Sequence, residues 1–237
     1  MNAILTMSSF IFPLITFPYV SRILLPVGTG KVSFATSVVS YFSMFAQLGI
    51  PTYGIRACAK VMDNKEELSR TVQEIFIIIM VMTVITYIAF GITLVYVPRL
   101  QTERPLFLIM STTLLFNAVG LDWLYRGLEK YTYITVRSLL FKFIALLAMF
   151  ALIHQKSDYV IYGGISIFAS SASNICNLVN VHQYIQIRPV GKYQFWRHLK
   201  PVMIYFAMSC ATTIYTNQDT VMLGFIKTEI DVGYYNA

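Results

Sequence analysis

Long apolar tracts without charge are the feature that most constrains how this chain can fold. Residues 75–97 contain no charged side chain, and a helix of that length is long enough to cross the hydrocarbon core of a bilayer. Only 12% of the residues are charged and 57% are hydrophobic, whereas about 25% are charged in an average soluble domain. The chain has too few charges to coat a soluble core. The sequence therefore predicts an all-α, polytopic membrane protein.

Seven membrane spans are expected from the apolar tracts. They cover residues 3–20, 32–50, 75–97, 106–121, 136–153, 160–181 and 201–226. The third span is the clearest, and the fifth, which is short and contains Lys142, is the weakest. We predict a six-helix N-terminal lobe over residues 1–184, a cytoplasmic linker over residues 185–200, and a seventh helix, within residues 201–237, that begins a second lobe.

A short internal sequence similarity supports the expectation of a second lobe. Repeated halves are typical of transporters, and similar residues follow the first and the seventh spans. These are Gly30, Phe34 and Ala35 after the first span, and Gly233, Asn236 and Ala237 after the seventh. We therefore expect this chain to be a fragment of a two-lobed transporter, unable to transport alone.

The basic residues of the predicted loops are distributed unequally. Eleven Lys and Arg residues lie in the loops after the second, fourth and sixth spans, and six lie in the loops of the other side. Because cytoplasmic loops are enriched in basic residues, this bias predicts a cytoplasmic N-terminus. The net charge of +7 is explained by topology, and its dispersal among loops argues against nucleic-acid binding.

Polar residues recur at helical spacing inside three spans. Small and hydroxyl residues in membrane helices often serve helix packing alone, which is the alternative for any one of them. Three such faces together favour a shared hydrated cavity. The candidate lining residues are Thr36, Ser40, Ser43 and Gln47 in the second span, Ser170, Ser173 and Asn177 in the sixth, and Asn217 and Asp219 in the seventh.

Four cationic side chains in or near the spans indicate the nature of the cavity. They are Arg22, Arg56, Arg126 and Lys142. Each could instead extend to the membrane surface as an interfacial anchor. Charges in hydrocarbon are costly and usually face protein or water, and an excess of cations suits an anionic ligand such as a phosphate head group. The hypothesis is that they supply positive potential for an anionic ligand of this kind.

Two prolines interrupt the first span. Pro13 and Pro18 lie about 140° apart around an ideal helix, so they do not form one packing ridge. Prolines kink helices and are tolerated in membranes, where neighbouring groups satisfy the freed carbonyls. We expect them to bend the first span and let it flex, as an alternating transporter requires; a static kink is the alternative.

No enzyme or metal motif is found. The stretch VGTGKVS resembles a phosphate-binding loop, but Leu25 and Val32 occupy positions that require Gly and Ser or Thr. The three cysteines and three histidines are scattered without metal-ligand spacing. The sequence predicts neither a catalytic residue, a metal site nor a cofactor.

Three ordered segments resemble a known transporter family. They are similar to segments of the Wzx polysaccharide flippases, or O-antigen transporters. The three segments are FPLITFPYVSRILLPVGTGKVSFATSVVSYFSMFAQLGIPTYGIRACAK, DWLYRGLEKYTYITVRS and NQDTVMLGFIKTEIDVGYYNA. The Wzx flippases belong to the multidrug/oligosaccharidyl-lipid/polysaccharide exporter superfamily. The resemblance implies two helical lobes around a central cationic cavity. Arg22, Arg56 and Arg126 stand in matching segments.

The resemblance also implies a function and its surroundings. It implies transfer of undecaprenyl-diphosphate-linked oligosaccharide units across a bacterial inner membrane, for O-antigen, capsule or exopolysaccharide synthesis. The expected partners are the lipid-linked oligosaccharide and membrane lipids, with a polysaccharide polymerase and assembly proteins as further candidates.

Two other function classes remain open. A cation-coupled multidrug antiporter of the same superfamily would be expected to have more membrane carboxylates than the central Asp219. A membrane enzyme of glycan assembly is disfavoured by the short exterior loops and the missing catalytic motifs. Glycosyltransferase genes beside this gene would favour the flippase.

The basic bias predicts which loops can be labelled from outside the cell. Cysteines placed at Thr102 and Ser157 should react with an impermeant thiol reagent, because their loops are expected outside. Cysteines at Lys60, Lys130 and Lys192 should remain unlabelled until the cells are opened. The opposite labelling pattern would contradict the topology.

Overall fold

The fold is built from helices alone in the part of the chain that the computed structural model describes, residues 2–186, 188–191 and 193–236. Three short helical turns, Lys156–Asp158, Phe168–Ala172 and Val181–Gln183, join the longer elements. The α-helices are α1 (Asn2–Gln47), α2 (Ile50–Lys60), α3 (Lys65–Tyr96), α4 (Pro98–Gln101), α5 (Arg104–Val119), α6 (Asp122–Gly127), α7 (Tyr131–Leu152), α8 (Tyr159–Ile167), α9 (Asn174–Asn180), α10 (Trp196–Ile226) and α11 (Glu229–Tyr235).

The helices have the length and apolar surface of membrane spans. Three described stretches are long and apolar enough to cross a bilayer, namely Met7–Lys60, Lys65–Tyr96 and Tyr131–Leu152, and Arg104–Val119 is apolar but shorter. Apolar side chains of α3 such as Val81, Ile88 and Ile92 are more than half exposed, as expected of a surface in contact with lipid. The all-α membrane architecture is confirmed, while the number of crossings stays a prediction.

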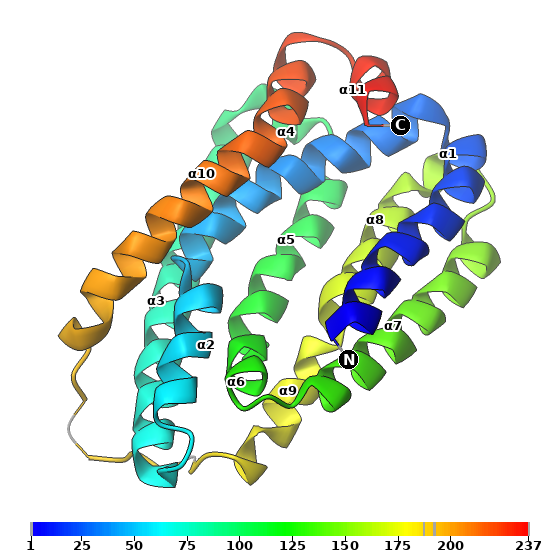
Figure 1. Ribbon diagram of the computed structural model, residues 1–237. Coiled ribbons are helices and arrows are strands. Elements are labelled where there is room, and N and C mark those ends of the chain that lie inside the picture. The colour runs from blue at the N-terminus through cyan, green and yellow to red at the C-terminus, as the bar shows by residue number, and fades with distance from the viewer. Residues whose placement is uncertain (1, 187, 192, 237) are drawn as a thin grey trace.

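The first two expected spans form one broken helix. In α1 the backbone leaves the helical conformation at Leu25, with φ 59° and ψ 174°. A residue that precedes proline is disfavoured in the helical conformation, and Pro26 follows directly. The helix continues through Pro13 and Pro18, so the sharp change of direction lies at Leu25 and not at the two predicted prolines. Figure 1 shows this turn at the upper right.

The predicted loops gather at opposite ends of the molecule. At one end, Glu103 forms an ion pair with Lys31 (2.6 Å) and accepts a hydrogen bond from Tyr159 Oη (2.7 Å). At the other end, the Lys130 ammonium lies 5.7 Å from the centre of the Tyr184 ring. The two ends are separated by the length of the helices (Figure 1). Which end faces the cytoplasm stays a prediction.

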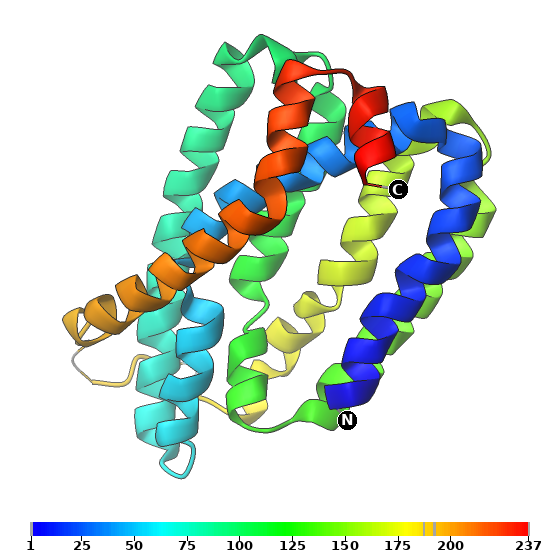
Figure 2. The same ribbon diagram turned by 45° about the horizontal axis from the view of Figure 1, so that its top comes forward.

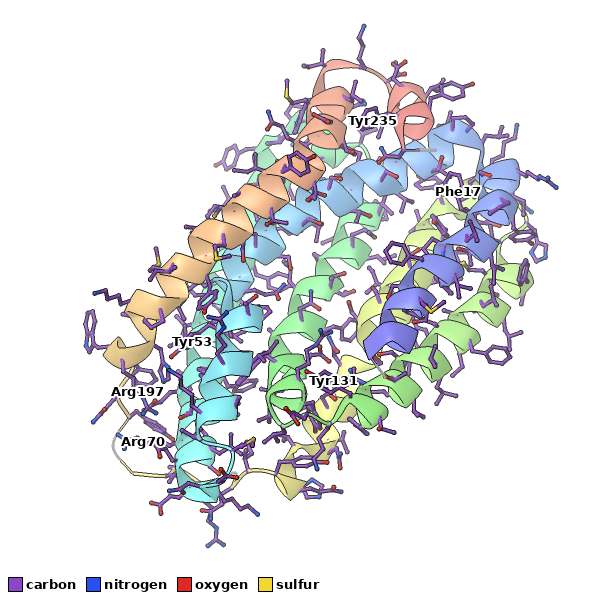
Figure 3. The ribbon with its side chains drawn as sticks, in the orientation of Figure 1. Phe17, Tyr53, Arg70, Tyr131, Arg197 and Tyr235 are labelled. Atoms are coloured by element: carbon purple, nitrogen blue, oxygen red, sulfur yellow. The ribbon has the colours of Figure 1, made fainter. Side chains whose placement is uncertain are left out.

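A buried carboxylate near the start of α3 binds the start of α10 and the segment just before it. Glu74 is fully buried and lies 2.6 Å from the Arg197 guanidinium and 2.7 Å from His198 Nε2. The backbone N–H of Gln194 also donates to it, at 2.6 Å. His198 Nδ1 in turn lies 2.6 Å from Tyr53 Oη on α2. Figure 3 shows Tyr53, Arg70 and Arg197 around this end of α3 and α10.

Further hydrogen bonds hold the predicted linker, residues 185–200, against α3. Gln73 donates to the carbonyl oxygens of Gln186 (2.8 Å) and Arg188 (3.0 Å), and it accepts from Tyr193 Oη (3.0 Å). Lys192, one of the predicted loop cations, lies outside the described residues. The linker is therefore a docked segment whose last residues already belong to α10.

The C-terminal helix α11 covers the break in α1 (Figure 2). A Cβ atom on Gly30 would lie 1.8 Å from the Glu229 carbonyl oxygen, and one on Gly233 would lie 2.0 Å from the Pro26 carbonyl oxygen. Gly30 and Gly233, which both belong to the internal sequence similarity, thus allow this close approach. Ala237, which also belongs to it, lies outside the described residues. At the start of α11, hydrogen bonds from Thr228 hold the pKa of Asp231 below its usual range.

Removing the Glu74 carboxylate should destabilise the docked linker. Glu74→Ala would leave Arg197 and His198 without their shared acceptor, and breaking a buried pair typically costs about 3–5 kcal/mol. We expect a clear fall in the unfolding temperature in detergent. Glu67→Ala, at an exposed position on the same helix, is the matched control. Equal stability of the two variants would contradict the role of Glu74.

Glycine is required where α11 crosses α1. Gly30→Ala should loosen the crossing, because overpacking typically costs about 1–3 kcal/mol. Gly91→Ala is the control, since no atom lies within 4 Å of its added Cβ. The expected result is a lower unfolding temperature for Gly30→Ala alone. An unchanged temperature for Gly30→Ala would show that α11 does not press on α1 in solution.

Candidate functional site

A polar cavity of about 660 Å³ lies inside the helical assembly. It is bounded by the first half and the last residue of α1, the start of α2, the end of α5, α6, α7, and the segment that joins α8 to α9. Some of the side chains that line it are apolar, and the others carry a charge, an amide or a hydroxyl group. The latter are Ser9, Gln47, Thr52, Asn117, Asp122, Arg126, Arg137, Ser138, Lys142, Ser170, Ser173 and Asn174.

The turn between α5 and α6 places the charged residues of α6 at the cavity. Leu121 has a positive φ of 46°, which ends α5 and redirects the chain. Asn177 and Asn174 donate to the carbonyl oxygens of Gly120 and Phe116, respectively. The two asparagines from α9 thus satisfy backbone acceptors at the end of α5 and hold the turn in place.

One carboxylate binds two arginines in the wall of the cavity. Asp122 Oδ2 lies 2.6 Å from Arg126 Nε, and Asp122 Oδ1 lies 3.1 Å from Arg137 Nη2. Arg137 is only 7% exposed and donates to the Ser173 carbonyl oxygen at 2.7 Å. With Lys142, the lining contains three cations and one carboxylate. The cavity therefore has an excess of positive charge.

Two buried donors in the lining residues have no protein partner. Arg137 Nε and Trp123 Nε1 make no hydrogen bond to any described residue. Because leaving a buried donor unsatisfied is costly, such groups usually bind water or a ligand. Both are donors only, so only an acceptor group could satisfy them.

Lys142 joins α7 to the N-terminal part of α1. Its ammonium group donates to Ser8 Oγ and Ser9 Oγ, each at 3.0 Å. No carboxylate of the described residues lies within ion-pair distance of it. An ammonium has three donors, so Lys142 can still bind an anion from the cavity.

The structure brings several of the predicted site residues together. Arg126, Lys142, Gln47, Ser170 and Ser173 all line the main cavity. They come from four separate segments of the chain. Of the polar face predicted on the second span, Gln47 reaches this cavity.

A second, smaller cavity of about 200 Å³ lies between the second half of α1 and α10. Ser40, Ser43 and Gln47 line it from α1, and Ser209 and Thr213 line it from α10. Gln47 thus separates the two cavities and contributes to both.

Other predicted residues lie outside both cavities. Arg22 and Thr36 are exposed. Arg56 is exposed as well, and its guanidinium carbon lies 5.5 Å from the centre of the Tyr205 ring on α10. The prediction that these side chains line the cavity is therefore wrong for this structure. Arg22 lies just before the break of α1 at Leu25, and Arg56 on α2 points toward Tyr205 on α10.

The remaining polar candidates form contacts within the protein. Asn177 is fully buried, and its backbone carbonyl oxygen accepts from Tyr125 Oη at 2.7 Å. Asn217 donates to the Thr213 carbonyl oxygen on its own helix. Asp219 accepts from Tyr235 Oη at 2.7 Å. Asn177 and Asp219 thus connect different helices, Asn217 bonds within α10, and none of the three lines either cavity.

Arg137 and Trp123 line the cavity but are not among the predicted site residues. From the sequence, Arg137 is one of the eleven basic residues assigned to the loops of one side, although the predicted fifth span starts at residue 136. An arginine inside an apolar span is unusual, and this signal could have identified it. The indole of Trp123 carries no comparable signal, because its role depends on the turn at Leu121.

No cluster of three or more His, Cys, Asp or Glu side chains suited to a metal ion occurs among the residues that the structure describes.

Comparison with known proteins identifies the family. The family model described as "Polysaccharide biosynthesis protein" matches residues 1–237. The chain belongs to this family. The resemblance inferred from its sequence segments is thereby confirmed. No solved structure matches the chain significantly.

Two curated relatives of this chain are each named "Putative O-antigen transporter". The one from Escherichia coli (strain K12) is 27% identical over 237 residues, which cover 99% of this chain and 57% of that protein. The one from Shigella dysenteriae is 25% identical over 233 residues, which cover 97% of this chain and 58% of that protein. The chain thus spans little more than half the length of these relatives.

Proposed function

We propose that this chain contributes to the translocation of undecaprenyl-diphosphate-linked oligosaccharide units across the bacterial inner membrane, for O-antigen, capsule or exopolysaccharide synthesis. The observation that carries the proposal is the cavity in which Arg126, Arg137 and Lys142 exceed the single carboxylate of Asp122. The family membership and the two relatives named as O-antigen transporters support it.

The chemistry of the cavity matches a diphosphate. A planar guanidinium binds phosphate oxygens through two parallel hydrogen bonds, and an ammonium binds them as a point charge. Ser170 and the amides of Asn117 and Asn174 supply further polar contacts that suit sugar hydroxyls.

The transport role extends to a second bundle of helices. Transporters with alternating access move two bundles against each other around a central site. In this proposal residues 1–184 form the first lobe, and α10 and α11 belong to the second. The docked linker held by Glu74 then joins the lobes on the cytoplasmic side, where the N-terminus also lies. A polysaccharide polymerase and assembly proteins are the proposed partners beyond the lipid-linked substrate.

We propose a non-enzymatic role. Both curated relatives are named as transporters, and the titratable groups of the cavity are engaged in ion pairs or hydrogen bonds. Asp122, for example, forms ion pairs with two arginines.

Substitution of the cavity cations should weaken diphosphate binding. Loss of one charge-assisted hydrogen bond typically costs about 1.5–3 kcal/mol, which is a factor of about 10 or more in affinity. We expect this loss for Arg126→Ala and for Lys142→Ala, measured by calorimetric titration of the protein in detergent with inorganic diphosphate. Arg126→Lys should be intermediate, because it keeps the charge and loses the planar fork.

Arg22→Ala is the matched control, since Arg22 is an exposed cation outside the cavity. Equal weakening by all the alanine variants would indicate a general effect of net charge. Unchanged binding by Arg126→Ala and Lys142→Ala would reject the cavity as the anion site.

A further inference from the structure

A groove of about 550 Å³ separates the first half of α1 from α7. Apart from Ser8 and Lys142, only apolar side chains line it. They include Met7, Ile11 and Ile15 from α1 and Leu139, Phe143 and Leu146 from α7. Ile11 is 47% exposed and Phe143 is 58% exposed, so the groove opens at the surface of the molecule.

Specific contacts bound this groove at both ends. At one end Lys142 bridges the two helices through Ser8 and Ser9. At the other end Tyr19 Oη donates to the Ile153 carbonyl oxygen at 2.9 Å, and the Tyr19 ring packs edge-on against Phe150, with centroids 4.6 Å apart. The two helices run side by side between these contacts (Figures 1 and 2). The groove is therefore a defined slot along the helices.

Lys142 lies at the junction of the groove and the polar cavity and lines both. On α7, Arg137 and Ser138 face the cavity, whereas Leu139 and Phe143 face the groove. On α1, Ser9 and Phe10 line the cavity, whereas the neighbouring Met7 and Ser8 line the groove. The cationic cavity thus adjoins the apolar groove, and the Lys142 ammonium lies where they meet.

We propose that this groove binds the polyprenyl tail of a lipid whose diphosphate occupies the cavity. This inference rests on the proposed function. A ligand that joins an anionic head to a long hydrocarbon chain needs a polar and an apolar site in contact, with a cation near the phosphate. A free sugar phosphate would leave the groove empty, and a purely apolar molecule would leave the cations of the cavity without an anionic ligand. The charge at the junction therefore selects a lipid phosphate.

Photo-crosslinking tests the location of the tail. The probe is undecaprenyl diphosphate with a diazirine on its isoprenoid chain, added to the protein in phosphatidylcholine nanodiscs. We expect the crosslinked peptides to map to residues 7–15 and 139–146. Unlabelled undecaprenyl diphosphate should compete with the probe, and phosphatidic acid should not.

A bulky substitution separates the tail site from the head site. Ile11→Trp should fill the groove and reduce crosslinking about tenfold, which corresponds to displacing roughly two methylene groups of the tail. Binding of inorganic diphosphate should stay unchanged. Leu14→Trp is the matched control, because Leu14 is 75% exposed on the same helix and does not line the groove.

The outcomes distinguish this inference from the proposed function. Crosslinks elsewhere on the protein, with diphosphate binding intact, would overturn the tail site and leave the proposed function standing. Competition by phosphatidic acid equal to that by undecaprenyl diphosphate would overturn it too, since the groove would then bind ordinary acyl chains. Failure of the unsubstituted protein to bind diphosphate would reject the proposed function and this inference together. If Ile11→Trp does not fold, the crosslink map of the unsubstituted protein decides.

Discussion

A charge inside a membrane protein must be paired or hydrated, and this constraint organises the structure. Asp122 joins Arg126 and Arg137 at the wall of the main cavity, and Glu74 joins Arg197 and His198 near the start of α3. Arg126 lies on the same helix as Asp122, whereas Arg137 lies on α7 and the two partners of Glu74 lie on α10. Because breaking a buried ion pair is costly, the pairs that join different helices help to fix which helices lie together at the cavity and at the linker.

Breaks in the helices occur where other parts of the protein satisfy or cover the backbone. Irregular backbone at membrane depth is tolerated only when it is buried in protein or lines a water-filled cavity. The break in α1 at Leu25 is covered by α11 through Gly30 and Gly233. The turn at Leu121 is held by Asn174 and Asn177. The first break positions the two halves of α1, and the second brings Asp122 to the cavity.

The cavity and the groove together describe a site with two chemistries. The cavity combines three cations with amides and hydroxyls, and the groove is almost wholly apolar. Lys142 belongs to both. Such a site suits an amphipathic anion, which is the chemical class of the ligand in the proposed function. The second half of α1 and α10 add a smaller polar cavity beside it, where the proposed lobes would meet.

The sequence alone determined the all-α membrane architecture, because uncharged tracts such as residues 75–97 must span lipid as helices. It also indicated the family and a polar, cationic interior that includes Arg126 and Lys142. Only the tertiary structure decided which charges meet. Helical periodicity assigns a residue to a face of its own helix, but the break at Leu25 and the turn at Leu121 set how those faces are oriented. That is why Arg22 and Arg56 lie outside the cavity, while Arg137, assigned from the sequence to a loop, lies in its wall.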